Sequence, residues 1–178
     1  MVDGDGNAVS VTQSLGAFFG SGVMAGDTGI MLNNFLYWAE LDPTSAAVVA
    51  PHKRMGTRMA PVAISRNTRL FVMIGTPGSY GIPQTTTQMI SNVLDHGFSI
   101  QAAIEAPRIR TYAGTTIDIE DRVPDDVRAE LTRRGHDLRV IPDWSPAVGG
   151  GQGIMIDPES GTLMGGADPR RDGYAIAF

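Results

Sequence analysis

Residues 61–81 read PVAISRNTRLFVMIGTPGSYG, and this stretch decides the fold. Pro61–Ile64 and Leu70–Ile74 are apolar segments of strand length, and the polar segment Ser65–Arg69 between them is typical of a hairpin turn. The glycine-rich segment Gly75–Gly81 follows the second strand and leads toward a helical pattern. The stretch therefore predicts a strand, a turn, a second strand and a shaped loop that opens a helix.

Three helices are expected after this loop. The first runs from about Pro83 to His96, with apolar residues on one face, and stops at Gly97. Ser99 caps a second, short helix that reaches Ala106. The third begins at Pro124 with two acidic residues and ends at the basic pair before Gly135, as the helix dipole favours.

Further strands are expected on both sides of these helices. An order of strands, then helices, then strands fits an α+β layered domain better than a regular series of βαβ units. The length of 178 residues is typical of a single domain, which we expect to span residues 1–178. The expected strands are Ala8–Ser14 after a turn in Asp3–Asn7, Ile117–Ile119, Leu138–Ile141, and a hairpin of Gly153–Ile156 with Thr162–Met164.

The composition excludes several classes of protein. Apolar residues make up 42% of the chain and the formal net charge is −5, which fits a folded domain and disfavours a sequence-independent nucleic-acid binder. The absence of cysteine excludes disulfides and thiol catalysis. No uncharged apolar run approaches the roughly 18 residues of a membrane span, and no signal peptide is visible. These features leave the cellular compartment open.

The loop Gly75–Gly81 is the first candidate site. Its glycines let the backbone turn sharply and expose consecutive N–H groups, which is what an anion or oxyanion site requires. A phosphate-binding P-loop would end in a lysine, and this loop has none. Taken alone, the loop is more typical of a tight connection between a strand and a helix, and that alternative stays open.

Metal ions and cofactors are not expected. The turn Asp3–Asn7 matches only the first ligand spacings of a calcium loop and lacks the later glycine and acidic ligand, so a plain β-turn is favoured. The three histidines, His52, His96 and His136, follow no metal-ligand spacing. Ser79 paired with one of them would give a serine hydrolase, although the Gly-x-Ser-x-Gly elbow is missing. This alternative stays open as well.

Short motifs follow one another in a recognisable order along the chain. In that order they resemble the small, C-terminal subunit of the gamma-glutamyltranspeptidase family, over nearly all 178 residues. The resemblance implies an N-terminal-nucleophile hydrolase, whose αββα sandwich is built from two subunits and of which this chain is the small-subunit half. The motifs are Asp3–Val11, Phe19–Gly22, Gly29–Asn34, Lys53-Arg54 with Met59–Pro61, Gly75–Gly78, Glu105–Arg108, Gly151–Met155 and Gly166–Arg170.

The resemblance also implies a mechanism. A precursor in this family cleaves itself before a threonine, whose hydroxyl becomes the nucleophile and whose α-amino group acts as base. In relatives this threonine lies several residues before the match to Val2-Asp3. The chain begins at Met1, so the resemblance implies that the nucleophile is missing from it. We expect the isolated chain to be catalytically inactive.

Three residues match the family's catalytic positions. The backbone N–H groups of Gly78 and Ser79 match the two oxyanion donors, and a backbone donor does not require a glycine. Ser14 matches a threonine that supports the nucleophile, while Gly16 stands where relatives have an asparagine.

Four residues match the positions that bind the glutamyl group. Trp38 stands where true transpeptidases have an acid for the substrate α-amino group, and Phe35 replaces a polar partner. Thr57 and Arg58 match a serine pair that holds the α-carboxylate. Because the acid is absent, a charge-assisted contact to an ammonium is lost. We therefore expect an acylase-like or amide-hydrolysing enzyme whose acyl group has no free α-amine.

The partners follow from the same resemblance. The large, N-terminal subunit of the same precursor is the expected partner, with self-association through exposed apolar surface where that subunit is absent. The expected substrate is a small-molecule amide or peptide. A non-catalytic remnant or binding module, in which the Gly78 loop holds an anion without chemistry, stays open as an alternative.

Overall fold

The computed structural model describes residues 1–177, and its backbone divides into two compact units. The main unit consists of Met1–Val11 and the chain from Arg58 onward, and the loop unit consists of Thr12–Thr57. Each unit is described by itself below. The expectation of one domain over residues 1–178 stays a prediction.

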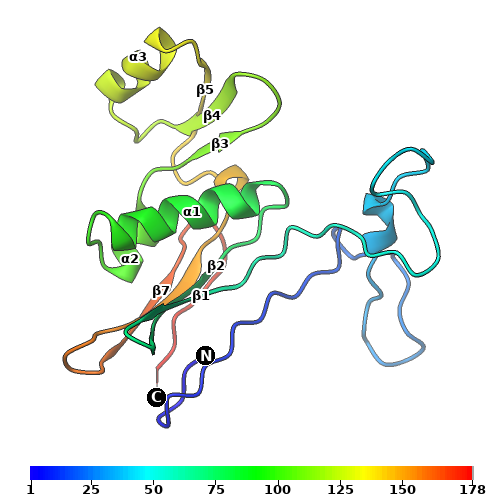
Figure 1. Cartoon of the computed structure of the whole chain (residues 1–178), viewed down its shortest axis with the longest axis horizontal. Helices are drawn as coiled ribbons and strands as arrows, with labels where there is room; N and C mark the ends of the chain where they lie inside the picture. The colour runs from blue at the N-terminus through cyan, green and yellow to red at the C-terminus, as the bar shows by residue number, and fades with distance from the viewer. Residues whose placement is uncertain (178) are drawn as a thin grey trace. The chain divides into compact units, whose positions relative to one another are not determined.

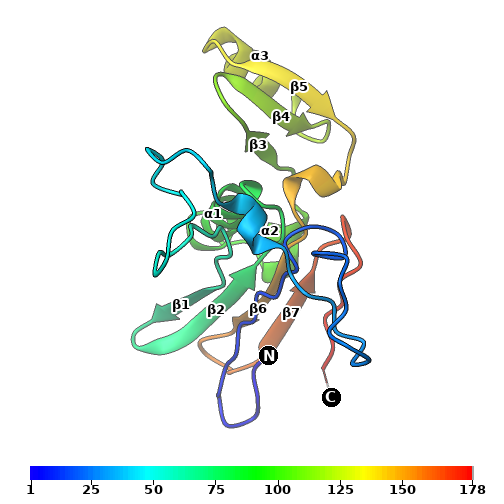
Figure 2. The same ribbon diagram turned by 90° about the vertical axis from the view of Figure 1, so that its right-hand side faces the viewer.

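The main unit is built on a four-stranded antiparallel sheet, whose strands lie side by side in Figure 2. The two predicted hairpins are confirmed, with Ile64 opposite Val72 in the first and Ile156 opposite Leu163 in the second. The strand order is β1-β2-β6-β7, with β1 at Val62–Arg66, β2 at Arg69–Gly75, β6 at Gln152–Ile156 and β7 at Leu163–Ala167.

Two helices cover one face of this sheet (Figure 1). Helix α1 spans Gly81–Leu94, starting two residues earlier than predicted, because proline is tolerated in the first turn of a helix. Helix α2 spans Ile100–Glu105, and the Ser99 hydroxyl caps it by accepting a hydrogen bond from the Ala102 N–H at 3.3 Å. The core between helices and sheet contains Val72, Ile74, Met89, Val93, Ile100 and Ile104.

A second sheet of three strands lies on the other side of α1 (Figure 1). Its strands are β3 (Ile109–Thr111), β4 (Thr116–Glu120) and β5 (Asp137–Ile141), in the order β3-β4-β5. Helix α3 (Asp125–Arg133) connects β4 to β5, which run parallel. β3 was not predicted, because three residues around the charged Arg110 give no strand signal. The α+β class is confirmed by the two sheets and three helices of residues 1–177.

The predicted strand over Ala8–Ser14 is wrong. The turn before it does form, because the Asp3 carboxylate accepts hydrogen bonds from the N–H groups of Asp5 and Asn7 at 3.0 and 2.8 Å. Beyond the turn, the bridge between Val2 and Ala8 and the backbone hydrogen bonds between Met1 and Val9 join the two arms, but no regular strand forms over Ala8–Ser14.

The loop unit has little regular structure. It contains the 3-10 helix η1 (Phe35–Trp38) and two isolated bridges, Met24 with Met31 and Glu40 with Val48. Polar side chains tie its turns, as where the Asn34 side chain accepts a hydrogen bond from the Ala17 N–H at 2.9 Å. Among residues 1–177, no helix has the length and apolar character needed to cross a membrane.

Candidate functional site

The loop between β2 and α1 presents two neighbouring backbone donors. Gly78 has φ = +139° and Ser79 has φ = +55°, so the chain turns sharply before α1. The Gly81 N–H donates to the Gly78 carbonyl and the Ile82 N–H to the Ser79 carbonyl, which starts the helix. Within residues 1–177, neither the Gly78 nor the Ser79 N–H donates to another protein group. Both donors sit at the positive end of the α1 dipole, where an anion is favoured.

Two arginines flank this loop. The Arg58 guanidinium lies 3.7 Å from the centroid of the Tyr80 ring and hydrogen-bonds the Tyr80 hydroxyl. The Arg110 side chain lies against Gly81, within 3.3 Å of where a Cβ would be, and donates to the Ala147 carbonyl at 2.9 Å. The structure thus places Arg58, predicted as a carboxylate ligand, in contact with the residue that follows the two donors. Tyr80 and Arg110 were missed, because no local sequence signal joins them to this loop.

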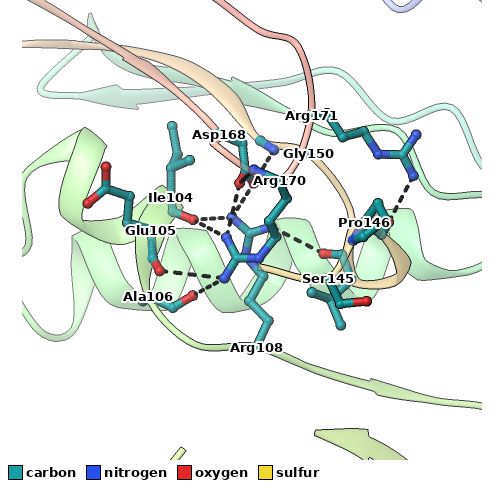
Figure 3. A network of polar contacts seen from close by, with 12 residues as sticks. Ile104, Glu105, Ala106, Arg108, Ser145, Pro146, Gly150, Asp168, Arg170 and Arg171 are labelled. Atoms are coloured by element: carbon teal, nitrogen blue, oxygen red, sulfur yellow. Dashed lines mark hydrogen bonds and ion pairs between the residues drawn. The ribbon is translucent and has the colours of Figure 1, made fainter. Parts of the chain in front are cut away.

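Four buried charged residues form a cluster in the main unit, and Figure 3 labels three of them, Arg108, Asp168 and Arg170. In this buried ion cluster, Arg170 pairs with Glu120 at 2.6 Å and with Asp168 at 3.0 Å, and Arg108 pairs with Asp168 at 2.7 Å. The four side chains are at most 1% exposed. Arg108, Asp168 and Arg170 lie in the motifs that carry the family resemblance, but the sequence predicted no contact for any of the four residues.

The buried ion cluster also binds backbone from several elements. The Asp168 carboxylate accepts the Gly151 N–H at 2.7 Å, and Arg108 donates to the Val148 carbonyl at 3.1 Å. Arg170 donates to the Ile104 and Ala106 carbonyls at the end of α2. Val148 closes the 3-10 helix η2 (Pro146–Val148), and Gly151 comes directly before β6. The cluster therefore fixes the segment between η2 and β6 against α2.

The charges of the cluster set its protonation. Burial raises the pKa of Glu120, but the hydrogen bond and charge of Arg170 outweigh this and hold the pKa below its usual value. Burial likewise raises the pKa of Asp168, and the charge of Arg108 overcomes it, so that this pKa is also lowered. Burial and the neighbouring Arg170 lower the pKa of Arg108. Both carboxyl groups are therefore ionised at neutral pH.

We expect stability to fall in acid because of these two carboxyl groups. Their pKa values are lower in the folded than in the unfolded chain, so their contribution is complete above about pH 4 and is lost as the pH falls through the lowered values. Urea midpoints measured on the complete gene product between pH 7 and pH 2 should drop steeply below pH 4. In Glu120→Gln the drop should be shallower, and a slope identical to wild type would contradict the assignment.

The remaining predicted site residues lie in the loop unit. Phe35 and Trp38 are brought together in η1, where their half-buried rings pack edge to face with centroids 4.8 Å apart. The exposed Ser14 hydroxyl accepts a hydrogen bond from the Gly16 N–H at 3.0 Å. The Asn34 amide contacts the position that a Cβ on Gly16 would occupy. The roles predicted for these residues and for the exposed Thr57 at the end of the unit stay predictions.

Ser79 and His96 are not brought together. They lie beyond opposite ends of α1, whose 14 residues span about 20 Å. His136 follows α3, and His52 lies in the loop unit. The positions of Ser79 and His96 therefore give no support to a serine hydrolase built on this pair. Among residues 1–177, no group of three or more histidine or acidic side chains gathers that could hold a metal ion.

The two sheets, with a glycine loop leading from a central strand into α1, are the fold of the N-terminal-nucleophile hydrolases represented by solved gamma-glutamyltranspeptidases. The family model described as gamma-glutamyltranspeptidase matches residues 1–178. The chain belongs to the gamma-glutamyltranspeptidase family. The resemblance inferred from the ordered motifs is confirmed.

Three relatives illustrate this membership. The chain is 40% identical over 185 residues to the glutathione hydrolase-like YwrD proenzyme of Bacillus subtilis, covering 100% of this chain and 35% of the relative. It superposes on the cephalosporin acylase of Bacillus halodurans with a TM-score of 0.92 and 38% identity, covering 99% of this chain and 33% of the other.

The third relative is a highly active mutant of the gamma-glutamyltranspeptidase of Pseudomonas nitroreducens, in which aspartate replaces a tryptophan. It gives a TM-score of 0.85 at 29% identity and covers 100% of this chain and 96% of that chain. The curated relative above is a proenzyme, and this chain spans about a third of its length. The matched region is thus the smaller part of such a precursor.

Proposed function

We propose that these residues are the small-subunit part of an enzyme that transfers or hydrolyses acyl groups from amides. The observation that carries the proposal is the pair of neighbouring N–H donors of Gly78 and Ser79 at the start of α1. Arg58, held against Tyr80, adds a cation beside the same loop. The nucleophile in this proposal is an N-terminal threonine that residues 1–178 do not supply, and no cofactor is needed.

The proposed reaction is an acyl transfer in two steps. The threonine hydroxyl attacks the amide carbonyl and passes its proton to the α-amino base, and the carbonyl oxygen becomes an oxyanion. The N–H groups of Gly78 and Ser79 then donate to that oxyanion. The amine leaves with a proton, and water or a second amine releases the acyl group from the threonine. Loss of one such donor lowers kcat by about 10²–10³-fold in comparable sites.

The acyl group is proposed to lack a free α-amine. The edge-to-face pair of Phe35 and Trp38 offers ring carbons where a substrate ammonium needs a carboxylate. A carboxylate on the same acyl group would instead be held by Thr57 and Arg58. The acylase of Bacillus halodurans among the relatives supports this choice over a strict glutathione enzyme.

The test compares two anilides that differ only in the amine. We expect the complete gene product to hydrolyse glutaryl p-nitroanilide with a kcat/KM at least tenfold above that for gamma-glutamyl p-nitroanilide. Trp38→Asp should reverse this preference, because it supplies a carboxylate for the ammonium.

Tyr37→Asp is the matched control, because it adds the same charge to η1 on a side chain that is 78% exposed. It should leave the preference unchanged. A strong wild-type preference for the gamma-glutamyl anilide would contradict the proposed acyl class. Absence of turnover with both anilides would favour a non-catalytic binding module instead.

The partner is proposed to be the larger part of the same precursor. The loop unit exposes large apolar side chains, including Phe18 at 97% and Leu41 at 89%. Exposed apolar surface on this scale is typical of a surface that another chain covers. Where the larger part is absent, self-association is the expected alternative. The precursor architecture of the relatives supports the first choice.

A further inference from the structure

We propose that Thr76 is a positioning residue that aims the Gly78 N–H at the reacting carbonyl oxygen. The inference rests on the proposed function, because it needs Gly78 to act as an oxyanion donor. Thr76 belongs to neither the predicted donors nor the predicted substrate ligands. It lies at the start of the glycine loop and is 6% exposed.

The Thr76 hydroxyl makes two hydrogen bonds. It donates to the Pro77 carbonyl at 2.9 Å and accepts the Gly150 N–H at 2.9 Å. The hydroxyl is therefore used inside the protein both as a hydrogen-bond donor and as an acceptor. An isosteric valine would remove both bonds while keeping the volume of the side chain.

The first bond controls the direction of a catalytic donor. The Pro77 carbonyl and the Gly78 N–H belong to the same peptide plane, and residues 1–177 contain no cis peptide bond. In a trans peptide the C=O and N–H point in opposite directions. Because Thr76 holds the carbonyl oxygen on its own side, the Gly78 N–H must point away from Thr76. One hydroxyl thus sets the orientation of the donor without touching the substrate.

The second bond ties this hydroxyl to a rigid support. Gly149 has φ = +100°, and a Cβ there would lie 2.6 Å from the Thr76 hydroxyl oxygen and 3.0 Å from the Thr85 methyl group. Gly78 itself approaches Gly149 closely, since a Cβ on Gly78 would lie 3.8 Å from the Gly149 Cα. Gly151 lies two residues after Gly149, and its N–H donates a hydrogen bond to Asp168 of the buried ion cluster. The support therefore reaches from the cluster to the donor loop through three glycines.

The loop needs such support because its backbone is unusual. Ser79 adopts a left-handed conformation that residues other than glycine rarely occupy, and such conformations persist only when the surroundings hold them. If the Thr76 hydroxyl only accepted the hydrogen bond of the buried Gly150 N–H, it would stabilise the fold without setting the direction of the Gly78 N–H. Removing the hydroxyl would then leave kcat unchanged, whereas the positioning role predicts that kcat falls.

The test uses Thr76→Val in the complete gene product, with rates counted per processed subunit by mass spectrometry. We expect kcat for the preferred anilide to fall about 10–100-fold, while KM changes less than twofold. This fall does not exceed the effect of removing a whole oxyanion donor, which is about 10²–10³-fold. Thr76→Ser keeps the hydroxyl and should restore kcat to within about threefold of wild type. If circular dichroism shows that Thr76→Val is unfolded, Thr76→Cys replaces it. A smaller fall in kcat, again with little change in KM, is then expected.

Thr86→Val is the matched control. Thr86 is buried in α1, and its hydroxyl has no hydrogen-bond partner in residues 1–177. This variant should keep the wild-type kcat and KM. Wild-type kcat in a folded Thr76→Val, a rise in KM alone, or failure of serine to rescue would each overturn the positioning role. Absence of turnover by the wild-type protein would overturn the proposed function itself, and the positioning role with it.

Discussion

Replacing Asp168 by alanine should lower the free energy of unfolding by about 3–5 kcal/mol, the range for removal of one partner from a buried ion pair. Asp168 bridges Arg108 and Arg170, so its removal leaves two buried guanidinium groups facing one another. Burial and the neighbouring charge of Arg170 both lower the pKa of Arg108, as expected for two cations held close together away from water. The Gly151 N–H would also lose its acceptor. Urea unfolding of the complete gene product at pH 7 measures the loss.

Two further variants identify the cause. Asp168→Asn keeps an oxygen acceptor but removes the charge, so it should give an intermediate loss. Asp125→Ala removes a carboxylate whose side chain is 91% exposed and which pairs with Arg128. Water screens such a pair, so the loss should stay below about 1 kcal/mol. A similar loss in the exposed and buried variants would contradict the role of burial.

Replacing Met89 by alanine should lower the free energy of unfolding by about 2–5 kcal/mol, the usual cost of a large-to-small change in a core. Met89 is fully buried in α1 and packs in the cluster with Val72, Ile74 and Ile104. Its sulfur also lies within 2.5 Å of where a Cβ on Gly151 would be. The same urea experiment measures this loss.

Conservative and exposed changes provide the comparison. Met89→Leu nearly conserves volume and should cost less than about 1.5 kcal/mol. Leu94→Ala, in the last turn of the same helix, changes a side chain that is 43% exposed and should cost less than Met89→Ala. If Met89→Ala cost no more than Leu94→Ala, the core described between α1 and the sheet would be wrong.

The local elements followed from the sequence where the signal was itself local. The hairpin of β1 and β2 combines two apolar runs with a polar turn, and Ser99 caps α2 through its own side chain. The strand over Ala8–Ser14 did not form, although its composition favours a strand, because pairing with the segment before the turn ends at Val9. β3 was invisible because it depends on pairing with β4 more than on its three residues.

The candidate site was predictable only in part. Gly78 and Ser79 were found because a glycine loop between a strand and a helix has a recognisable pattern. Thr76 could not be found in this way, since its role depends on Gly150, which is 74 positions away. The buried ion cluster was hidden for the same reason. Arginine and acidic residues are usually exposed, and nothing near Arg108 in the sequence indicates a partner at Asp168.

The long reach of the buried ion cluster has a consequence for protein synthesis. Arg170 binds Glu120, 50 positions earlier, and the Ile104 carbonyl, 66 positions earlier. A ribosome makes Asp168 and Arg170 after Arg108 and Glu120, so until then the nascent chain lacks the Arg108–Asp168 and Glu120–Arg170 ion pairs. Closing such long loops is slow and comes late in folding. The contact of Asp168 with Gly151, which completes the support of the donor loop, therefore forms only after Asp168 has been synthesised.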